Sequence, residues 1–299
     1  MQLRPALNLA VERLTAQHVP SPRMNAELLI MFTLDCDRAY LYAHPERELT
    51  AEEASRYDAA LARRATGEPA QYITGHQEFW GMDLIVSPAV LIPRPETEHV
   101  IEAVLEIVSK SQVNQSRKPG EGPRTEEAAL RIADVGTGSG AIALALAREL
   151  PTAKIDATDI SDAALEVARA NAARHELSSR IAFHHADLLS GLPPRTFDVV
   201  VSNPPYVGES EEDSVQLEVR KFEPRVAVFS GPTGFEVIER LVAQAPEALR
   251  PGGWLIFEIS GTIADRVPGM LKEWTAVEIR NDLQGIPRVA IARKIASGS

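Results

Sequence analysis

Apolar residues recur at helical spacing through the first seventy or so positions of the chain. One face of the first expected helix carries Leu3, Leu7, Val11 and Leu14. Ser21, followed by a proline, predicts an N-cap with proline at the first helical position. Thr50 and Glu53 form a capping-box pattern, and Gly67 predicts the end of that helix. We therefore predict a small helical bundle over residues 1–75, without a cofactor motif.

The pattern changes to β-formers between residues 78 and 93, where Gly81 and Ser87-Pro88 interrupt the apolar run. This pattern predicts a β-hairpin, which we take as a linker over residues 76–94. After residues 93–98, the apolar spacing from Val100 to Val108 predicts a helix. Residues 109–127 are rich in Ser, Pro, Gly and charge, and they predict a flexible insertion to which we assign no function.

Strands and helices then alternate within residues 95–299, which we take as the second domain. The expected strands are 130–135, 154–158, 180–184, 197–202, 254–259, 275–280 and 288–294. The expected helices are 141–150, 162–175 with Ser161 as its cap, 235–249 and 262–273. Such alternation predicts an α/β fold with a mostly parallel sheet covered on both faces. The last two strands are joined by a short segment with no room for a crossover helix, so they must pair antiparallel. The sheet is therefore a mixed, seven-stranded one.

Composition limits the kind of partner. The 299 residues carry a formal net charge of −11, and the pI is about 5.2, which argues against a broad nucleic-acid footprint. Cys36 is the one cysteine, so no intrachain disulfide forms, and a small buried hydrophobe is a better reading of it than a nucleophile. The first residues lack a signal-peptide layout, and no apolar run reaches the roughly 20 residues that cross a bilayer. We expect a cytoplasmic protein that binds neither a membrane nor a stable nucleic acid and acts as a monomer.

A glycine-rich turn, Gly136-Thr137-Gly138-Ser139-Gly140, lies between an expected strand and helix. Glycine allows a ligand to approach the backbone, and the helix N-terminus supplies N–H groups. A tight structural turn is the alternative reading. Asp159 ends the next strand roughly 20 residues on, where an acidic side chain can bind a ribose diol. Its alternative role is to cap the helix, but Ser161 can do that itself.

The glycine spacing favours S-adenosylmethionine over a dinucleotide. A dinucleotide turn has the spacing G-x-G-x-x-G, and here the third glycine comes one residue early. The antiparallel terminal strands also depart from the dinucleotide fold. Asp134 can face the methionine ammonium or order the turn. Asp187 with Leu188 can contact adenine, and a helix or loop cap is an equal alternative for Asp187.

The most informative segment is Asn203-Pro204-Pro205-Tyr206, which follows a buried strand. An amide nitrogen is a poor nucleophile, so an enzyme that methylates it must hold both N–H groups and aim the nitrogen at the methyl carbon. The Asn203 side chain and the Pro204 carbonyl are acceptors, Pro205 stiffens the turn, and Tyr206 offers an aromatic face. No general base is required before the transfer. A rigid turn that only ends the strand is the alternative reading.

His184-His185 suggests a metal, but no third ligand lies at suitable spacing, so we predict no metal site.

Together these motifs resemble the bacterial release-factor glutamine N5-methyltransferases over nearly the whole chain. The Asn-Pro-Pro-Tyr motif alone is shared with adenine and other amino-group methyltransferases, and its combination with residues 93–98 is far more specific. The matching segments are residues 67–75, 93–98, 134–140, 159, 203–206, 222–227 and 282–288.

The resemblance implies a Rossmann-like class I methyltransferase fold that binds S-adenosylmethionine. By the family pattern Gly136–Gly140, Asp159, Leu188 and Asn203 line the cofactor site. Residues 203–206 hold the glutamine of the Gly-Gly-Gln loop of class I peptide-chain release factors, and the N-terminal domain docks that protein. The position of Leu188 is aromatic in some relatives, and the 109–127 insertion departs from shorter ones.

Other readings stay open at this point. Arg94 and Glu96 either shape the substrate channel or pair with each other to organise the junction before the helix. A rival function is an adenine-N6 or guanine-N2 nucleic-acid methyltransferase, in which Tyr206 stacks on a flipped base. A second rival is a non-catalytic S-adenosylmethionine-binding protein associated with the ribosome.

Overall fold

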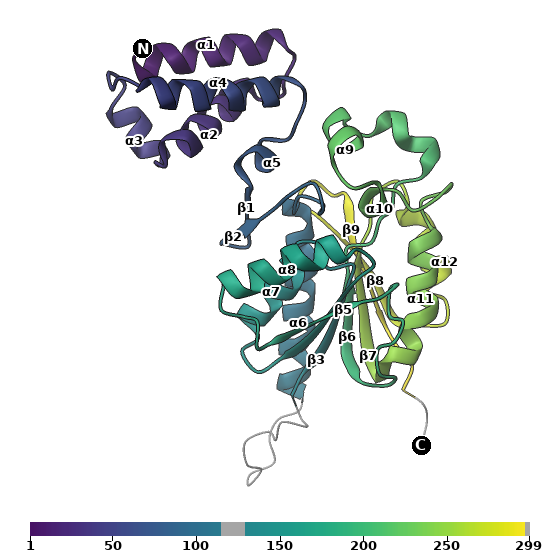
Figure 1. Ribbon diagram of the computed structural model, residues 1–299. Helices are drawn as coiled ribbons and strands as arrows, with labels where there is room; N and C mark the ends of the chain where they lie inside the picture. The colour runs from purple at the N-terminus through teal and green to yellow at the C-terminus, as the bar shows by residue number, and fades with distance from the viewer. Residues whose placement is uncertain (115–128, 297–299) are drawn as a thin grey trace. The chain divides into compact units, whose positions relative to one another are not determined.

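The computed structural model describes residues 1–114 and 129–296 and divides into two compact units. The first unit comprises Met1–His76 with Gln216–Phe222, and the second comprises Gln77–Val215 with Glu223–Ser299. Figure 1 follows the chain through both units, with residue number shown by colour. No helix within the described ranges is long and apolar enough to cross a membrane.

The first unit is a helical bundle. Its helices are α1 (Leu3–Ala16), α2 (Pro22–Leu34), α3 (Arg38–Ala43), α4 (Ala51–Ala65), α5 (Ala70–Thr74) and α9 (Leu217–Phe222). Leu3 and Leu14 of the expected apolar face are buried in its core, and Leu7 and Val11 pack at the edge. Cys36 is half-buried beside this core.

The three predicted helix signals of this unit lie at the helix ends where the sequence placed them. The Thr50 hydroxyl accepts from the Glu53 amide, and the Glu53 carboxylate accepts from the Thr50 amide, which completes the capping box. Gly67 has φ of 92° just after α4. Ser21 is the N-cap of α2 and Pro22 is its first residue, as predicted, but Ser21 has a left-handed backbone and its side chain makes no cap bond.

Helix α9 is held to the bundle by Arg64, although it lies far along the sequence. The Arg64 guanidinium is 2% exposed, and it donates to Asn25 Oδ1 at 2.7 Å and to Glu218 Oε1 at 2.5 Å. These two hydrogen bonds compensate the buried charge of Arg64, which would be costly without partners.

A β-hairpin of β1 (His76–Phe79) and β2 (Met82–Ile85) confirms the predicted hairpin, but it is shorter than expected. Residues 86–93 form no strand. Pro88 and Pro93 have no N–H to give to a sheet, so this apolar segment remains a loop.

The second unit is built on a seven-stranded sheet with the order β5-β4-β3-β6-β7-β9-β8. Its strands are β3 (Arg131–Val135), β4 (Lys154–Asp159), β5 (Ile181–His185), β6 (Phe197–Ser202), β7 (Leu249–Glu258), β8 (Thr275–Asn281) and β9 (Pro287–Arg293). Strand β9 is antiparallel to both β7 and β8, and the other pairs are parallel. The predicted α/β class with a mixed, Rossmann-like sheet is therefore confirmed.

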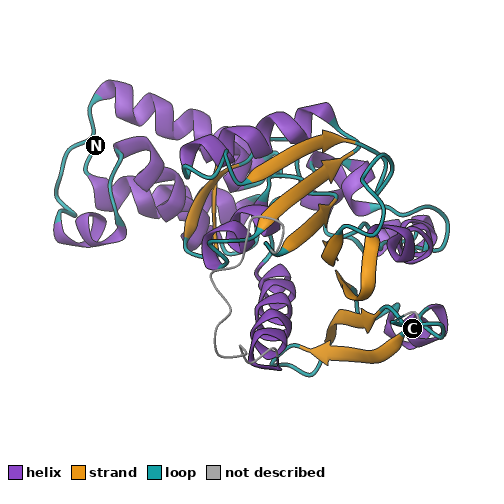
Figure 2. Ribbon diagram, turned by 90° about the horizontal axis from the view of Figure 1, so that it is seen from below, coloured by secondary structure: helices purple, strands orange, loops and turns teal. Residues whose placement is uncertain are grey.

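Helices cover both faces of this sheet, as Figure 2 shows. One face packs against α6 (Glu98–Asn114), α7 (Ala141–Glu149) and α8 (Asp162–Arg174). The other packs against α11 (Glu236–Ala248) and α12 (Val267–Met270). The connections in this unit contain four short helical elements: η1 (Pro95–Thr97), η3 (Glu209–Ser214), α10 (Arg225–Val228) and η4 (Ala264–Arg266).

Two sequence expectations in this unit need correction. Residues 262–273 form only η4 and α12 rather than one helix, because Pro268 and Gly269 do not favour a continuous one. Residues 109–114, expected in the insertion, continue helix α6. The rest of that expected insertion, 115–127, lies outside the described residues.

Strand β3 lies between β4 and β6, and the three run parallel, so their carboxyl ends meet at one edge. Val135 is in register with Ser202 of β6 and with Thr158 of β4. From β3 the chain continues to β4 and β5 on one side of β3, and then returns to place β6 on the other side. Open α/β sheets bind ligands at such a switch point.

Gly140, the N-cap of α7, fits where a side chain cannot. Its φ is 85°, and a Cβ there would lie 2.4 Å from Leu144 Cδ1 and 3.3 Å from Ala168 Cβ. We predict that Gly140→Ala lowers the free energy of unfolding by roughly 2–4 kcal/mol, measured by chemical denaturation. Gly285→Ala is the matched control, because Gly285 has φ of 79° but no described heavy atom within 4 Å of such a Cβ. Equal losses in the two variants would contradict a packing role for Gly140.

Candidate active site

The turn after β3 is held in place by the neighbouring strand β4. The amides of Gly136 and Thr137 both donate to the Thr158 carbonyl at 2.9 Å. Gly136 and Gly138 have φ of 71° and 55°, and no described heavy atom lies within 4 Å of where their Cβ atoms would be. The space beside these two glycines is thus open for a ligand to approach the main chain.

Asp134 orders this turn from beneath. The carboxyl is completely buried, and its Oδ2 accepts from Thr137 Oγ1 at 2.7 Å and from the Ala143 amide at 3.2 Å. Its Oδ1 has no hydrogen-bond partner among the described residues. Burial raises the pKa of Asp134 to about 7, against the two hydrogen bonds that lower it. Of the two roles left open by the sequence, these contacts support ordering of the turn.

Asp159 stands at the end of β4 and faces the same opening. Its Oδ2 accepts from the Gly138 amide and its Oδ1 from the Ser161 amide, each at 2.9 Å. Burial is the largest effect on the pKa of Asp159 and raises it. Ser161 Oγ accepts from the Ala164 amide and caps α8, so Asp159 is not required for that cap. Each carboxylate oxygen keeps a second lone pair for a ligand hydroxyl.

Asn203 begins the turn after β6, directly beside the glycine-rich turn. Ser202 Oγ donates to the Val135 carbonyl at 2.7 Å, which ties the ends of β6 and β3 together. The Asn203 side-chain NH2 donates to Thr97 Oγ1 at 3.0 Å. Its Oδ1 is at the other end of the amide, where it can accept from a ligand.

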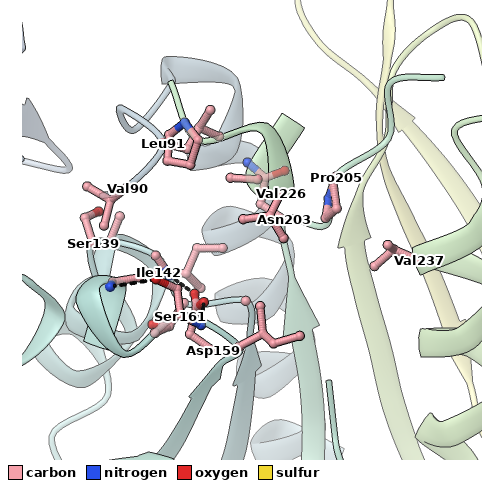
Figure 3. A pocket seen from close by; sticks show the side chains of 18 of the residues that line it. Val90, Leu91, Ser139, Ile142, Asp159, Ser161, Asn203, Pro205, Val226 and Val237 are labelled. Carbon is pink, nitrogen blue, oxygen red and sulfur yellow. Dashed lines mark hydrogen bonds between the residues drawn. The ribbon is translucent and has the colours of Figure 1, made fainter. Parts of the chain in front are cut away.

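One pocket joins these segments (Figure 3). The glycine-rich turn contributes residues 136–139, β4 and the following turn contribute Asp159 and Ser161, and the β6 turn contributes Asn203 and Pro205. Apolar walls come from Val90, Leu91, Ile142, Ile160, Leu188 and Val226. A mostly apolar pocket with a few convergent polar groups is the usual form of a small-molecule site.

Besides Asp134, which lies under the turn, three further residues that the sequence placed at the site do not line this pocket. Gly140 lies behind it and packs against α7 and α8, as described above. Pro204 is buried, and Tyr206 is half-buried, with its hydroxyl donating to Glu258 Oε1 at 3.1 Å. Their predicted roles in catalysis and binding stay predictions.

Asp187 and Leu188 lie at the pocket wall after β5. The Asp187 carboxylate pairs with Arg240 of α11, and both side chains are about half exposed. Leu188 has φ of 54°, uncommon for a side chain with a Cβ, so the backbone holds it in an unusual conformation beside the pocket.

The sequence analysis did not identify Thr97, which lines the pocket, or Glu258, which accepts a hydrogen bond from Thr97. Thr97 Oγ1 donates to Glu258 Oε2 at 2.6 Å. The pKa of Glu258 is raised to about 7, because the effect of burial outweighs the opposite effect of the hydrogen bonds to Thr97 and Tyr206. A carboxyl at the end of an otherwise apolar strand was the available signal.

Arg94 and Glu96 do not pair with each other. Arg94 pairs instead with the buried carboxylate of Glu223, which also accepts from the Ile92 amide at 3.2 Å. Glu96 faces Arg288 at 3.8 Å. The Arg94–Glu223 pair fastens the loop before α6 to the segment that leads into α10, and both segments contribute to the pocket.

His184 and His185 each have other partners. His184 Nε2 lies 2.9 Å from Asp156 Oδ1, and His185 Nε2 lies 2.9 Å from the Ile160 carbonyl. Among the described residues no group of three or more His, Cys, Asp or Glu side chains could hold a metal ion.

The pocket residues fit S-adenosylmethionine. The open space at Gly136 and Gly138 can take the amino-acid part of the cofactor against the main chain, and Asp159 offers acceptors for a ribose diol. Ile160 and Leu188 give apolar surface suited to a flat base.

Comparisons with known proteins agree with this site. The PrmC N-terminal domain family matches residues 5–75, and the Methyltransferase small domain family matches residues 124–221. In fold, the chain is similar to the hMettl16 catalytic domain solved with the MAT2A 3'UTR hairpin 6. The TM-score is 0.54 at 16% identity, over 86% of this chain and 92% of that one. Fold and site together define a class I S-adenosylmethionine-dependent methyltransferase.

Curated relatives narrow the class to one family. The release factor glutamine methyltransferase of Koribacter versatilis is 54% identical over 298 residues, 99% of this chain and 100% of that protein. The protein of the same name from Coxiella burnetii is 39% identical over 276 residues, 92% of each chain. The chain belongs to the release factor glutamine methyltransferase family, and the resemblance seen in the sequence is confirmed.

The buried Asp134 predicts a pH-dependent stability. Its folded pKa of about 7 is above its ordinary value, so between roughly pH 4 and pH 7 the folded state holds a proton that the unfolded state has lost. Stability from this residue therefore falls as pH rises through that window. In Asp134→Asn, the amide oxygen can take the place of Asp134 Oδ2 and keep both hydrogen bonds, and no charge forms. We predict that the free energy of unfolding of the variant, minus that of wild type, rises by on the order of 2–4 kcal/mol from pH 4 to pH 8, measured by denaturant unfolding without cofactor. A constant difference across that range would contradict the assignment.

Proposed function

We propose that this enzyme transfers a methyl group from S-adenosylmethionine to the side-chain amide nitrogen of the glutamine in the Gly-Gly-Gln loop of class I peptide-chain release factors. The observation that carries the proposal is the Asn203 carboxamide. It begins the turn after β6 in the pocket that the glycine-rich turn and Asp159 also line, with its NH2 end bonded to Thr97.

The residues that hold the cofactor come from three adjacent strand ends. The main chain of residues 136–139 takes its amino-acid part, Asp159 takes the ribose, and Asp187 with Leu188 lies beside the adenine. When bound, the cofactor supplies an electrophilic methyl group on a positively charged sulfur. The apolar walls exclude water, which strengthens each polar contact inside the pocket.

The clamp acts on the glutamine nitrogen. Asn203 Oδ1 and the Pro204 carbonyl each accept one N–H of the substrate amide, and Pro205 keeps the turn rigid. Tyr206 supplies an aromatic face for the planar amide. Two fixed acceptors would orient the nitrogen and favour the charge that develops on it as its bond to the methyl carbon forms, while the bond from that carbon to sulfur breaks and leaves a neutral thioether. The methylated nitrogen then loses one of its own hydrogens as a proton, which reaches solvent when the product leaves the pocket.

The first unit docks the release factor in this proposal. It is the part that matches the PrmC N-terminal domain family, and it exposes large apolar side chains such as Phe32 and Tyr42. Residues 76–94 link it to the methyltransferase domain of residues 95–299. The formal net charge of −11 disfavours nucleic acid as the substrate.

The proposal predicts one added methyl group on the glutamine of the Gly-Gly-Gln peptide, detected by mass spectrometry after incubation of a release factor with enzyme and cofactor. Asn203→Ala removes one acceptor of the clamp, and we expect kcat to fall roughly 100-fold or more. Cofactor affinity, measured by calorimetry, should weaken much less.

Asn281→Ala is the matched control, because Asn281 is exposed on β8 and makes the same change of side chain. Its kcat should equal that of wild type. Parallel reactions with DNA and RNA are part of the same experiment. Methyl transfer to nucleic acid, or an unmodified release factor with cofactor bound, would overturn the proposal.

A further inference from the structure

A continuous chain of hydrogen bonds runs behind the pocket from Asn203 to Tyr206. Asn203 Nδ2 donates to Thr97 Oγ1 at 3.0 Å, Thr97 Oγ1 donates to Glu258 Oε2 at 2.6 Å, and the Tyr206 hydroxyl donates to Glu258 Oε1 at 3.1 Å. Thr97 is 4% exposed and Glu258 is 1% exposed. Water therefore has little access to replace any of these bonds.

The hydrogens of this chain determine which way the Asn203 amide points. A threonine hydroxyl has one hydrogen, and Thr97 gives it to the carboxylate. Towards Asn203 the same oxygen can then only accept. A carboxamide has one donor end and one acceptor end, so Asn203 must turn its NH2 to Thr97. Its Oδ1 is thereby directed away from Thr97.

Glu258 fixes the direction of donation in its ionised form, which predominates above its pKa of about 7, because a carboxylate can only accept. Its two oxygens take one hydrogen each, from Thr97 and from Tyr206. It lies at the end of β7, in register with Val289 of β9, so the main chain around it is held by the sheet. Thr97 is held in turn by its amide, which donates to the Arg94 carbonyl at 3.0 Å. Neither partner can readily move to allow the opposite arrangement.

Burying this carboxyl is costly, and the cost points to a role in the site. Burial disfavours the charged form of Glu258, and Glu96 adds to that effect, while Arg288 opposes it. An apolar residue at this position would avoid the penalty. What the carboxylate provides is the fixed direction of two hydroxyl hydrogens next to the Asn-Pro-Pro-Tyr turn.

We propose that Thr97 and Glu258 are positioning residues that hold the Asn203 amide with its oxygen towards the substrate, so that the clamp accepts a carboxamide and rejects a carboxylate. The inference rests on the proposed function and extends it to substrate selectivity. A glutamine offers N–H groups to the two acceptors. A glutamate in the same place offers only oxygen, and unpaired acceptors would face each other.

Thr97→Val tests this, because valine keeps the shape of threonine but can neither accept from Asn203 nor donate to Glu258. We expect kcat for the release factor to fall about tenfold or more, while the dissociation constant for the cofactor changes by less than about threefold. Thr97→Ser is the matched variant that keeps the hydroxyl, and it should restore most of kcat. Thermal unfolding of both variants shows whether they are folded.

A second readout concerns selectivity. A release factor with Gly-Gly-Glu in place of Gly-Gly-Gln should inhibit wild type and Thr97→Ser poorly. It should inhibit Thr97→Val more strongly, because the Asn203 amide can then turn its NH2 to the pocket. A Thr97→Val enzyme with wild-type kcat and wild-type inhibition would overturn the inference. So would equal losses in the valine and serine variants, which would indicate packing alone.

The amide orientation can also be observed without turnover. In enzyme with labelled asparagine amides and threonine methyl groups, the Asn203 NH2 hydrogens should show a nuclear Overhauser contact to the Thr97 methyl group. If wild type leaves the release factor unmodified, the proposed function fails, and this contact still decides the orientation. Absence of the contact in the assigned wild-type spectrum would refute the positioning role.

Discussion

The parallel pairing of β3 with β6 is the constraint on which the site depends. Val135 and Ser202 are in register, and the Ser202 hydroxyl bonds to the Val135 carbonyl. This pairing ends both strands at the same level, so the glycine-rich turn and the Asn203 turn open on one pocket. A register shift of one residue would turn every side chain of β6 to the opposite face of the sheet and separate the two turns.

Two buried carboxyl groups support this arrangement from behind, and each does so at a cost. Asp134 orders the turn after β3, and Glu258 directs the hydrogens near the turn after β6. Burial raises the pKa of both to about 7. Carboxyl groups with strongly shifted pKa values cluster at functional sites. Stability is thus given up at the two places where the pocket requires fixed donors and acceptors.

The sequence predicted what depends on local pattern. The apolar run of residues 197–202 gave the bounds of β6 correctly, and the short connection before β9 gave its antiparallel pairing. The turn glycines, Asp159 and Asn203 were placed because each follows a strand in a known arrangement. The expected helix over residues 262–273 failed because its apolar spacing competes with Pro268 and Gly269.

What the sequence did not predict are contacts between distant residues. Thr97 and Glu258 are 161 positions apart, and nothing in either neighbourhood indicates that they meet. Arg64 and Glu218 are 154 apart, so the place of α9 in the first unit could not be read from spacing. Arg94 was expected to pair locally with Glu96, yet it pairs with Glu223. Glu223 is far away in the sequence, and only the folded chain brings its carboxylate next to Arg94. Such pairs arise only once the sheet order is set.

The central claim concerns where two oxygen atoms point, and a crystal structure with S-adenosylhomocysteine and a Gly-Gly-Gln peptide measures that directly. The account predicts that the glutamine amide nitrogen lies within about 3.2 Å of both Asn203 Oδ1 and the Pro204 carbonyl oxygen, on the side of the pocket that faces the cofactor sulfur. A glutamine bound elsewhere, or an Asn203 amide that turns its nitrogen to the peptide, would contradict it.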